Sequence, residues 1–315
     1  MSVDPLAPLV VAVLTFRREA ELAHLLPELL RQADLVEGGA TVLVVDNDPA
    51  AGARGVVQAV DGARYVHEPT PGIAAARNRA LDEAGDAAQL VFVDDDEWPE
   101  PDWLARLLGS AEATGAAAVV GPVVSRFVGT PSRFVAAGRF FDRRRLPSGT
   151  TVDVAATNNL LLDLAVVRGA GLRFDERFGL SGGSDTLFTR QLHAAGGRLV
   201  WDDAAVVHDE VPAARLTAGW VLRRALRSGN SWSRSSLALT SDPRRRLLVA
   251  LRLVLRGLVR LAGGAARMLA GAVLLRMGWV AQGLRTMARG AGMVGGATGL
   301  TYREYARPTG SSTRL

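Results

Sequence analysis

The sequence contains neither cysteine nor lysine, so each of its 37 basic residues is an arginine. The absence of cysteine excludes disulfide bonds, thiolate metal sites and cysteine nucleophiles, and it is compatible with a reducing cytoplasmic location. The 315 residues are 48% hydrophobic and 22% charged. This composition supplies one large core or two modest cores and excludes a disordered chain.

Long uninterrupted apolar runs are missing as well. The C-terminal region does not reach the ~18 apolar residues of a bilayer-spanning helix. The residues that interrupt it are Arg252, Arg256, Arg260, Arg267, Arg276, Arg285 and Arg289. Residues 2–8 are few, contain proline and carry Asp4, which is not the pattern of a signal segment. We therefore expect neither a spanning helix nor a secretory signal.

Charge is divided unevenly along the chain. From residue 211 onward there are 18 arginines against Asp242 and Glu304, about +16, whereas the first 210 residues hold 19 arginines against 30 acids, about −11. A basic, apolar last third predicts contact with an anionic surface. That third lacks the interleaved aromatic residues and motifs of nucleic-acid binding, so we expect no nucleic-acid partner. We expect a cytoplasmic protein, peripheral on the inner face of the cell membrane.

Strands and helices alternate over the first 110 residues. Apolar runs predict strands at 9–15, 41–45, 64–67 and 90–93, and the segments between them, 19–33, 52–60 and 72–84, predict helices. Such an order indicates an α/β fold with a doubly wound, mostly parallel sheet. Right-handed crossovers then bring the strand ends, and with them Thr15, Asp46, Gly72 and Asp94, to one edge.

The run LVFVDDDEW at residues 90–98 carries the clearest chemical signal. Four apolar residues, typical of a strand buried on both faces, are followed by Asp94, Asp95, Asp96 and Glu97. Ligands bind at this edge of open α/β sheets. Carboxylate oxygens on a tight turn suit Mg²⁺ or Mn²⁺, which usually also bind substrate phosphates. The alternative is an acidic solvated loop that caps the next helix at Asp102.

The other strand ends offer nucleotide contacts. An aspartate such as Asp46 can accept the two donors of a base or ribose, and a glycine such as Gly72 lets backbone N–H groups approach phosphate. Arg77, one turn into the following helix, could bind the same anion bidentately. Taken singly, Asp46 could equally cap a helix and Arg77 could be a surface residue.

Several segments together resemble glycosyltransferase family 2. They are VLTFRR at 13–18, VVDND at 44–48, PGIAAARNRAL at 71–81 and FVDDDEWPEPDWL at 92–104. The last of these, with GGSDTLFTRQLHAAGGRLVW at 182–201, is similar to bacterial polysaccharide transferases of the ExoM type. The resemblance covers about residues 8–235 and implies a GT-A fold, with a mixed sheet flanked by helices, and an inverting, metal-dependent transfer.

The resemblance also implies roles for individual residues. The metal ligands would be Asp94 and Asp96 of a D-x-D motif, with His208 completing the shell. The residues expected to bind the nucleotide sugar are Thr15, Arg17, Asp46, Gly72, Arg77, Asp94, Asp95, Asn158 and Arg227. Thr15 and Asp46 would hold the base, Asn158 would lie beside the donor sugar, and Arg227 would close over the diphosphate. Otherwise Asn158 is a turn residue and His208 a structural histidine.

Residues 179–190, GLSGGSDTLFTR, contain the expected catalytic base. Inverting transfer needs a group that removes the acceptor hydroxyl proton. Asp185 has a suitable setting, at the start of a helix predicted for 186–195 and directly after two glycines and Ser184. The family usually has Glu then Asp here, so the acceptor contacts of the missing Glu are in doubt. Alternatively, Ser184 or Asp185 only caps the helix.

The remaining catalytic domain is less regular. We expect strands at 116–124 and 157–162, an irregular segment at 125–149, a strand pair at 198–203 and 205–210, and a helix at 217–232 that ends near Gly229 and Asn230. The domain would span 1–240, with a nucleotide half at 8–110 and an acceptor half at 111–240.

Residues 241–300 predict basic amphipathic helices that lie in the headgroup plane of a membrane. We expect breaks at the pairs Gly263–Gly264 and Gly295–Gly296 and a flexible tail at 301–315. The alternative is a helical pair packed on the catalytic domain or on a second subunit of a homodimer.

The leading hypothesis is therefore a hexosyltransferase that uses Mg²⁺ or Mn²⁺ and a UDP-, dTDP- or GDP-sugar. Its acceptor would be a glycan, above all a polyprenyl-linked one, in cell-surface polysaccharide synthesis or a secondary metabolite. A sugar-1-phosphate nucleotidyltransferase is a second hypothesis, although the segment after the first strand lacks the glycine-rich loop of that class. A catalytically silent sugar-binding scaffold is a third, for which Ser184 is the only hint.

Overall fold

An eight-stranded mixed sheet lies at the centre of the molecule, with strand order β3-β2-β1-β4-β9-β6-β10-β8. The computed structural model describes residues 8–302. The strands of this sheet are β1 Leu9–Thr15, β2 Ala40–Asp46, β3 Ala63–His67, β4 Gln89–Asp94, β6 Ala118–Val120, β8 Thr151–Val152, β9 Asn159–Asp163 and β10 Leu199–Trp201.

The predicted convergence of strand ends is confirmed. Strands β3, β2, β1 and β4 are parallel, and the register sets Thr15 opposite Asp46 and Leu14 opposite Asp94. Beyond β4 the sheet becomes mixed, because β9 runs antiparallel to both β4 and β6. The sheet therefore delivers the carboxyl ends of four strands to one edge.

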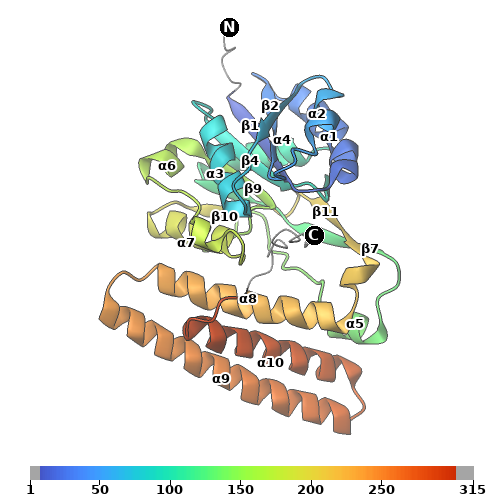
Figure 1. Cartoon of the computed structure of the whole chain (residues 1–315), viewed down its shortest axis with the longest axis vertical. Helices are drawn as coiled ribbons and strands as arrows, with labels where there is room; N and C mark the ends of the chain where they lie inside the picture. The colour runs from blue at the N-terminus through green and yellow to red at the C-terminus, as the bar shows by residue number, and fades with distance from the viewer. Residues whose placement is uncertain (1–7, 303–315) are drawn as a thin grey trace, which may run out of the picture.

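Helices cover both faces of the sheet (Figure 1). One face carries α1 Glu19–Asp34, α2 Arg54–Gln58 and α4 Trp103–Thr114, and the other carries α3 Ile73–Glu83, α6 Leu164–Gly169 and α7 Ser184–Ala194. Alternate residues of each central strand enter opposite cores, which explains why these strands are apolar throughout.

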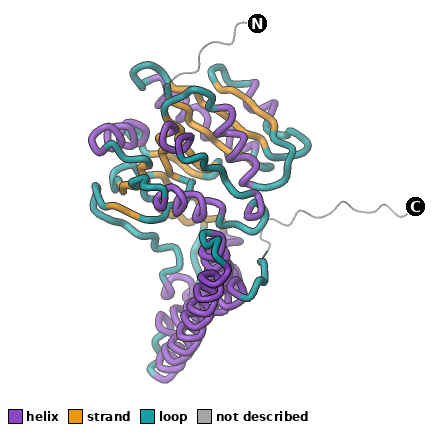
Figure 2. Tube along the Cα trace, turned by 90° about the vertical axis from the view of Figure 1, so that its left-hand side faces the viewer, coloured by secondary structure: helices purple, strands orange, loops and turns teal. Residues whose placement is uncertain are grey.

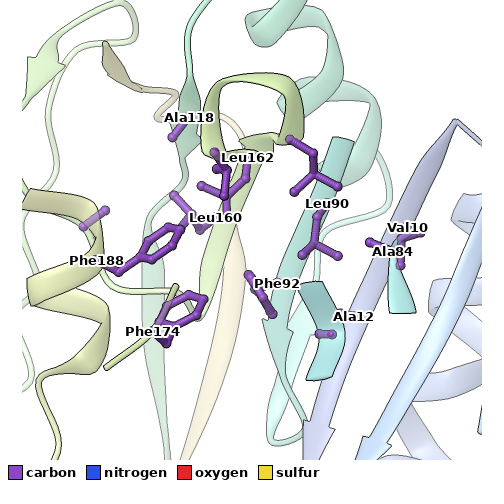
Figure 3. Packing of buried hydrophobic residues seen from close by; sticks show 14 of the residues in the cluster. Val10, Ala12, Ala84, Leu90, Phe92, Ala118, Leu160, Leu162, Phe174 and Phe188 are labelled. Atoms are coloured by element: carbon purple, nitrogen blue, oxygen red, sulfur yellow. The ribbon is translucent and has the colours of Figure 1, made fainter. Parts of the chain in front are cut away.

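The core beneath α7 is built on phenylalanines (Figure 3). Phe174 stacks on Phe188 with ring centroids 4.1 Å apart and meets the edge of Phe92 from β4 at 5.9 Å. Aromatic pairs of this kind stabilise beyond their buried area. The packing fixes α7, and with it Asp185, relative to the strand that ends in Asp94.

A second sheet of three strands, β5 Glu97–Pro99, β11 Val207–Pro212 and β7 Val123–Val128, corrects two predictions. The single strand expected at 116–124 is divided into β6 and β7, which belong to different sheets. The expected strand pair at 198–203 and 205–210 does not form, because β10 joins the large sheet and β11 the small one. The division at Gly121 has a steric reason, since a Cβ there would collide with the carbonyl oxygen of Ala205.

The C-terminal region is a layer of long helices that projects from the α/β body (Figures 1 and 2). Its elements are α8 Ala218–Ala238, α9 Pro243–Val273 and α10 Met277–Ala297, with the short α5 Arg133–Gly138 beside them. Helix α10 lies between α8 and α9. Within residues 8–302, no helix combines the length and apolar character needed to cross a bilayer.

The predicted glycine breaks in this layer are wrong. Helix α8 runs through Gly229, α9 runs through Gly263 and Gly264, and Gly295 and Gly296 lie inside α10. Most of these glycines sit where two helices approach too closely for a side chain: a Cβ on Gly264 would lie 2.7 Å from the carbonyl oxygen of Gly283. The tail predicted for 301–315 falls outside the described residues from position 303 onward.

Candidate active site

The carboxylates that follow β4 form the centre of the candidate site. Arg18 Nη1 lies 2.6 Å from Asp95 Oδ1 and 2.9 Å from Asp96 Oδ2. Arg215, which precedes α8, approaches Asp96 Oδ2 to 3.5 Å. Two guanidinium groups from distant segments thus offset the repulsion between adjacent carboxylates.

This compensation is incomplete. Burial raises the pKa of Asp94 to about 7, and the neighbouring charge of Asp96 adds to the effect, whereas Arg77 opposes it. Burial and then Asp94 likewise raise the pKa of Glu97 well above its usual range, although Asn158 donates a hydrogen bond of 2.6 Å to Glu97 Oε1. A cation bound here would offset the repulsion among these carboxylates.

Asp94 and Asp96 fit a divalent hard cation. Mg²⁺ is usually held by one or two carboxylates together with substrate phosphates. Among the described residues no group of three or more metal-binding side chains gathers. The donor set therefore suits Mg²⁺ or Mn²⁺ and not an all-protein cage.

His208 does not belong to this shell, contrary to the prediction. Its Nε2 contacts Glu100 and lies 3.1 Å from Arg126. The next residue in β11, Asp209, pairs with Arg143 and stands directly opposite Glu97 in β5. Successive side chains of a strand point to opposite faces, so His208 is turned away from the face that carries Glu97.

Arg77 connects the carboxylates to the predicted base. It is 8% exposed, donates from Nη1 to Ser184 Oγ at 2.8 Å, and lowers the pKa of Asp94 through its charge. Its Nε is buried without a hydrogen-bond partner among the described residues. Ser184 is the first residue of α7, and Asp185 follows it, partly exposed, after Gly182 and Gly183 with φ of 75° and 95°. The arrangement therefore brings Asp185 to the same edge as Asp94.

The loop before α3 has a structural task. Gly72 has φ of 122°, and a Cβ there would lie 3.2 Å from the backbone of Gly179. Its own N–H donates to Asn47 Oδ1 at 3.1 Å, and the expected approach of backbone N–H groups to a phosphate stays a prediction. Gly72 lets the loop before α7 pack against the start of α3.

Asp46 is also occupied within the protein. It is fully buried and accepts hydrogen bonds from the backbone N–H groups of Asp48 and Ala53, at 2.9 and 3.0 Å, and from the Tyr65 hydroxyl at 3.0 Å. These bonds use both carboxylate oxygens within the protein. The bond to Ala53, which precedes α2, comes near the helix-cap alternative, and the base contact stays a prediction. Thr15, opposite Asp46 in the register, is 2% exposed. Burial raises the pKa of Asp95, and the Thr15 hydroxyl opposes this with a smaller effect.

The other expected residues are spread around the same edge. The side chain of Arg17 is 63% exposed and lies 3.4 Å from Asp48 Oδ1. Asn158 is held by Glu97, as described above. Arg227 lies on α8, partly exposed, and adds to the positive charge around Arg224.

Sequence reasoning missed Arg18 and Arg215, and it gave Glu97, named in the acidic run, no role of its own. Arg18 and Arg215 compensate the aspartates, and Glu97 joins Asn158 to the carboxylate turn. Arg18 had a signal, since it follows a strand end within the VLTFRR segment. Arg215 had none, because it comes 119 residues after Asp96 and only the fold brings them together.

Comparison with known proteins identifies a family and a relative of this chain. The model of a family described as "Glycosyl transferase family 2" matches residues 10–166. The succinoglycan biosynthesis protein ExoM of Rhizobium meliloti (strain 1021) is 37% identical over 230 residues, which cover 71% of this chain and 74% of that protein.

Solved structures share the fold at low identity. The mannosyltransferase PcManGT from Pyrobaculum calidifontis, in complex with GDP-Man and Mn²⁺, is 18% identical with a TM-score of 0.63, covering 93% of this chain and 88% of that chain. S. aureus TarS 1–349 in complex with UDP-GlcNAc is 15% identical with a TM-score of 0.50, covering 94% and 93%.

Proposed function

Because the chain belongs to glycosyltransferase family 2, we propose that it transfers a hexose from a nucleoside-diphosphate sugar to an acceptor hydroxyl with inversion at the anomeric carbon. The observation that carries this proposal is the position of Arg77, which bonds to the first residue of α7 and acts electrostatically on Asp94. A nucleotide sugar bound between Asp94 and the start of α7 would lie close to Asp185. Family membership decides against the nucleotidyltransferase hypothesis.

The proposed chemistry needs one base and one leaving group. The acceptor oxygen attacks the anomeric carbon while Asp185 takes its proton, and the bond from that carbon to the diphosphate oxygen breaks with its electron pair on the diphosphate. Arg77 stabilises the negative charge on the leaving group. Mg²⁺ or Mn²⁺ held by Asp94 and Asp96 would supply further neutralisation of the diphosphate.

The donor and pathway follow from relatives. The fold neighbours bind GDP-Man with Mn²⁺ and UDP-GlcNAc, which supports a nucleotide-sugar donor here. The ExoM protein is named for succinoglycan biosynthesis, and we place this chain in the synthesis of a related cell-surface polysaccharide, with a polyprenyl-linked glycan as acceptor.

The outer face of α9 supports attachment to an anionic membrane. One side of α9 packs on α10 through Leu253, Gly257, Gly264 and Gly271. The other exposes apolar side chains that are more than half accessible: Leu247, Leu248, Leu251, Leu255, Leu258, Val259, Leu269 and Val273. Exposed arginines lie among them. An apolar stripe flanked by arginines fits the boundary between headgroups and acyl chains, on the inner face of the cell membrane.

Two measurements test the enzyme proposal. Thermal unfolding with Mn²⁺ and a panel of nucleoside diphosphates should show stabilisation by at least one of them. Asp185→Asn should lower turnover by roughly 100- to 10,000-fold, the usual contribution of a general base, while nucleotide stabilisation is retained. Unchanged turnover in Asp185→Asn would remove this residue from the chemistry, and absence of any turnover in the wild type would favour the silent scaffold.

A further inference from the structure

Four guanidinium groups gather beside the carboxylate turn, from three segments of the chain. Arg224 lies over the rings of Trp220 and Phe141, at 5.3 and 5.8 Å from their centroids, and Arg215 lies over the same Trp220 at 5.9 Å. Arg143 follows two residues after Phe141, and Arg227 is one helical turn beyond Arg224. We call Arg143, Arg215, Arg224 and Arg227 the arginine cluster.

In the part of the chain that the structure describes, two of the four arginines contact carboxylates, and Arg224 does not. Arg215 contacts Asp96, and Arg143 pairs with Asp209. Among the described residues Arg224 forms no ion pair with a carboxylate. Burial, and then repulsion by Arg143, Arg227 and Arg215, lower the pKa of Arg224 to about 10, with Asp209 opposing. Positively charged guanidinium groups that the fold holds close together predict an anionic ligand at the arginine cluster.

Unused hydrogen-bond donors point the same way. Arg143 Nε is buried and has no hydrogen-bond partner among residues 8–302. Arg143 and Arg215 keep 27% and 30% of their side-chain surface exposed, so a ligand can reach them from solvent. The planar guanidinium groups, which Trp220 and Phe141 hold from one side, suit bidentate contacts with phosphate oxygens.

The position of the cluster distinguishes it from the donor phosphates. The cluster meets the carboxylate turn at one end, where Arg215 contacts Asp96 and the charge of Arg143 lowers the pKa of Glu97. The cluster extends from there along α8, whose other side packs against α10 in the helical layer. We propose that the arginine cluster binds a phosphate or diphosphate group of the acceptor, which makes the acceptor a phosphate-bearing glycan lipid; this rests on the proposed function. The proposal moves Arg227, expected from the sequence at the donor diphosphate, to the acceptor.

Geranyl diphosphate, titrated calorimetrically into the full chain, tests this inference. The protein is first saturated with Mn²⁺ and the nucleoside diphosphate that stabilises it, so that the donor site is filled. We expect geranyl diphosphate to bind and geraniol not to bind. Arg224→Met should weaken binding by roughly 10- to 150-fold, the range for losing a charged hydrogen bond. Arg223→Met, an exposed neighbour on α8, is the matched control and should leave it unchanged.

Three results would overturn the inference. If the wild-type protein binds nucleoside diphosphate but not geranyl diphosphate, the acceptor site is refuted, whereas the proposed glycosyl transfer is unaffected. Equal affinity for geranyl diphosphate in Arg224→Met and Arg223→Met would do the same. Weaker nucleoside diphosphate binding in Arg224→Met, with geranyl diphosphate binding intact, would assign the cluster to the donor. Nucleotide binding also reports that each variant is folded, and Arg143→Met gives a second test of the cluster.

Discussion

Two adjacent glycines of α9 should respond to the same substitution with opposite signs. A Cβ added to Gly263 would meet no atom within 4 Å, whereas a Cβ on Gly264 would lie 2.7 Å from the carbonyl oxygen of Gly283 and 2.9 Å from the backbone nitrogen of Met287. Alanine in place of a helix-interior glycine stabilises by about 0.5–1 kcal/mol. Gly263→Ala should therefore stabilise the protein by about that amount.

Gly264→Ala gains the same helix propensity but must separate α9 from α10. The atoms it meets include backbone of α10, so no side-chain rotation relieves the contact. Overpacking of this kind destabilises by about 1–3 kcal/mol. The net effect should be a loss of roughly 0.5–2 kcal/mol, and the two variants should differ by about 1–3 kcal/mol.

Urea denaturation followed by circular dichroism measures this difference. Both variants make the same chemical change one residue apart, so effects on the unfolded chain cancel. The order of the midpoints should be Gly263→Ala, wild type, Gly264→Ala, from highest to lowest. If Gly264→Ala were as stable as Gly263→Ala, the close packing of α9 on α10 would be refuted, and with it the orientation of the outer face of α9.

Three further outcomes follow from the site, the exposed helix face and the core. Asp94→Asn should stabilise the metal-free protein at pH 8 by up to about 4 kcal/mol, at about 1.4 kcal/mol per unit of the pKa rise, and by roughly a third of that at pH 5. Because the pKa of Asp94 is raised to about 7, its carboxyl binds more protons in the native state than in the unfolded state between about pH 4 and 7. The free energy of unfolding of the wild type therefore falls as the pH rises through that window. Urea denaturation at pH 5 and pH 8 measures the difference. Leu255→Glu should reduce flotation with anionic phosphatidylglycerol vesicles, whereas Leu35→Glu, also exposed but on the α/β body, should not; equal binding by both variants would count against α9. Trp103→Phe should destabilise by about 1–3 kcal/mol in urea, because Trp103 Nε1 donates to buried Asn159 Oδ1 at 2.8 Å, and a loss no larger than that of an exposed substitution would argue against that bond.

The parallel half of the sheet and the carboxylate turn could be predicted because their signals are local. A strand such as β4 is buried on both faces and reads as an apolar run, and its end is marked by Asp94. Asp46 shows the limit of this reasoning. It also ends a strand, but its carboxylate accepts three hydrogen bonds from within the protein, and no residue pattern distinguishes a carboxylate satisfied in this way from one that faces a ligand.

Long-range contacts set the other limit. His208 follows an apolar run like the other site residues, yet its place in β11 turns it toward Glu100, and the pairing of β11 with β5 was not visible in the sequence. The glycines of the helical layer were read as breaks for a similar reason. Glycine ends a helix in some settings and permits close helix packing in others, and only the position of α10 decides which applies to Gly264.

The departure at Ser184 acquires a physical meaning in the structure. In the family pattern that this segment resembles, a glutamate usually precedes the catalytic aspartate. Here Ser184 is fully buried, and its hydroxyl accepts a hydrogen bond from Arg77. A neutral hydroxyl orients the guanidinium without neutralising it, whereas a carboxylate at this place would share its charge. Arg77 therefore keeps its full positive charge for Asp94 and for the diphosphate proposed to bind beside it, and Asp185 is left as the carboxylate at the start of α7.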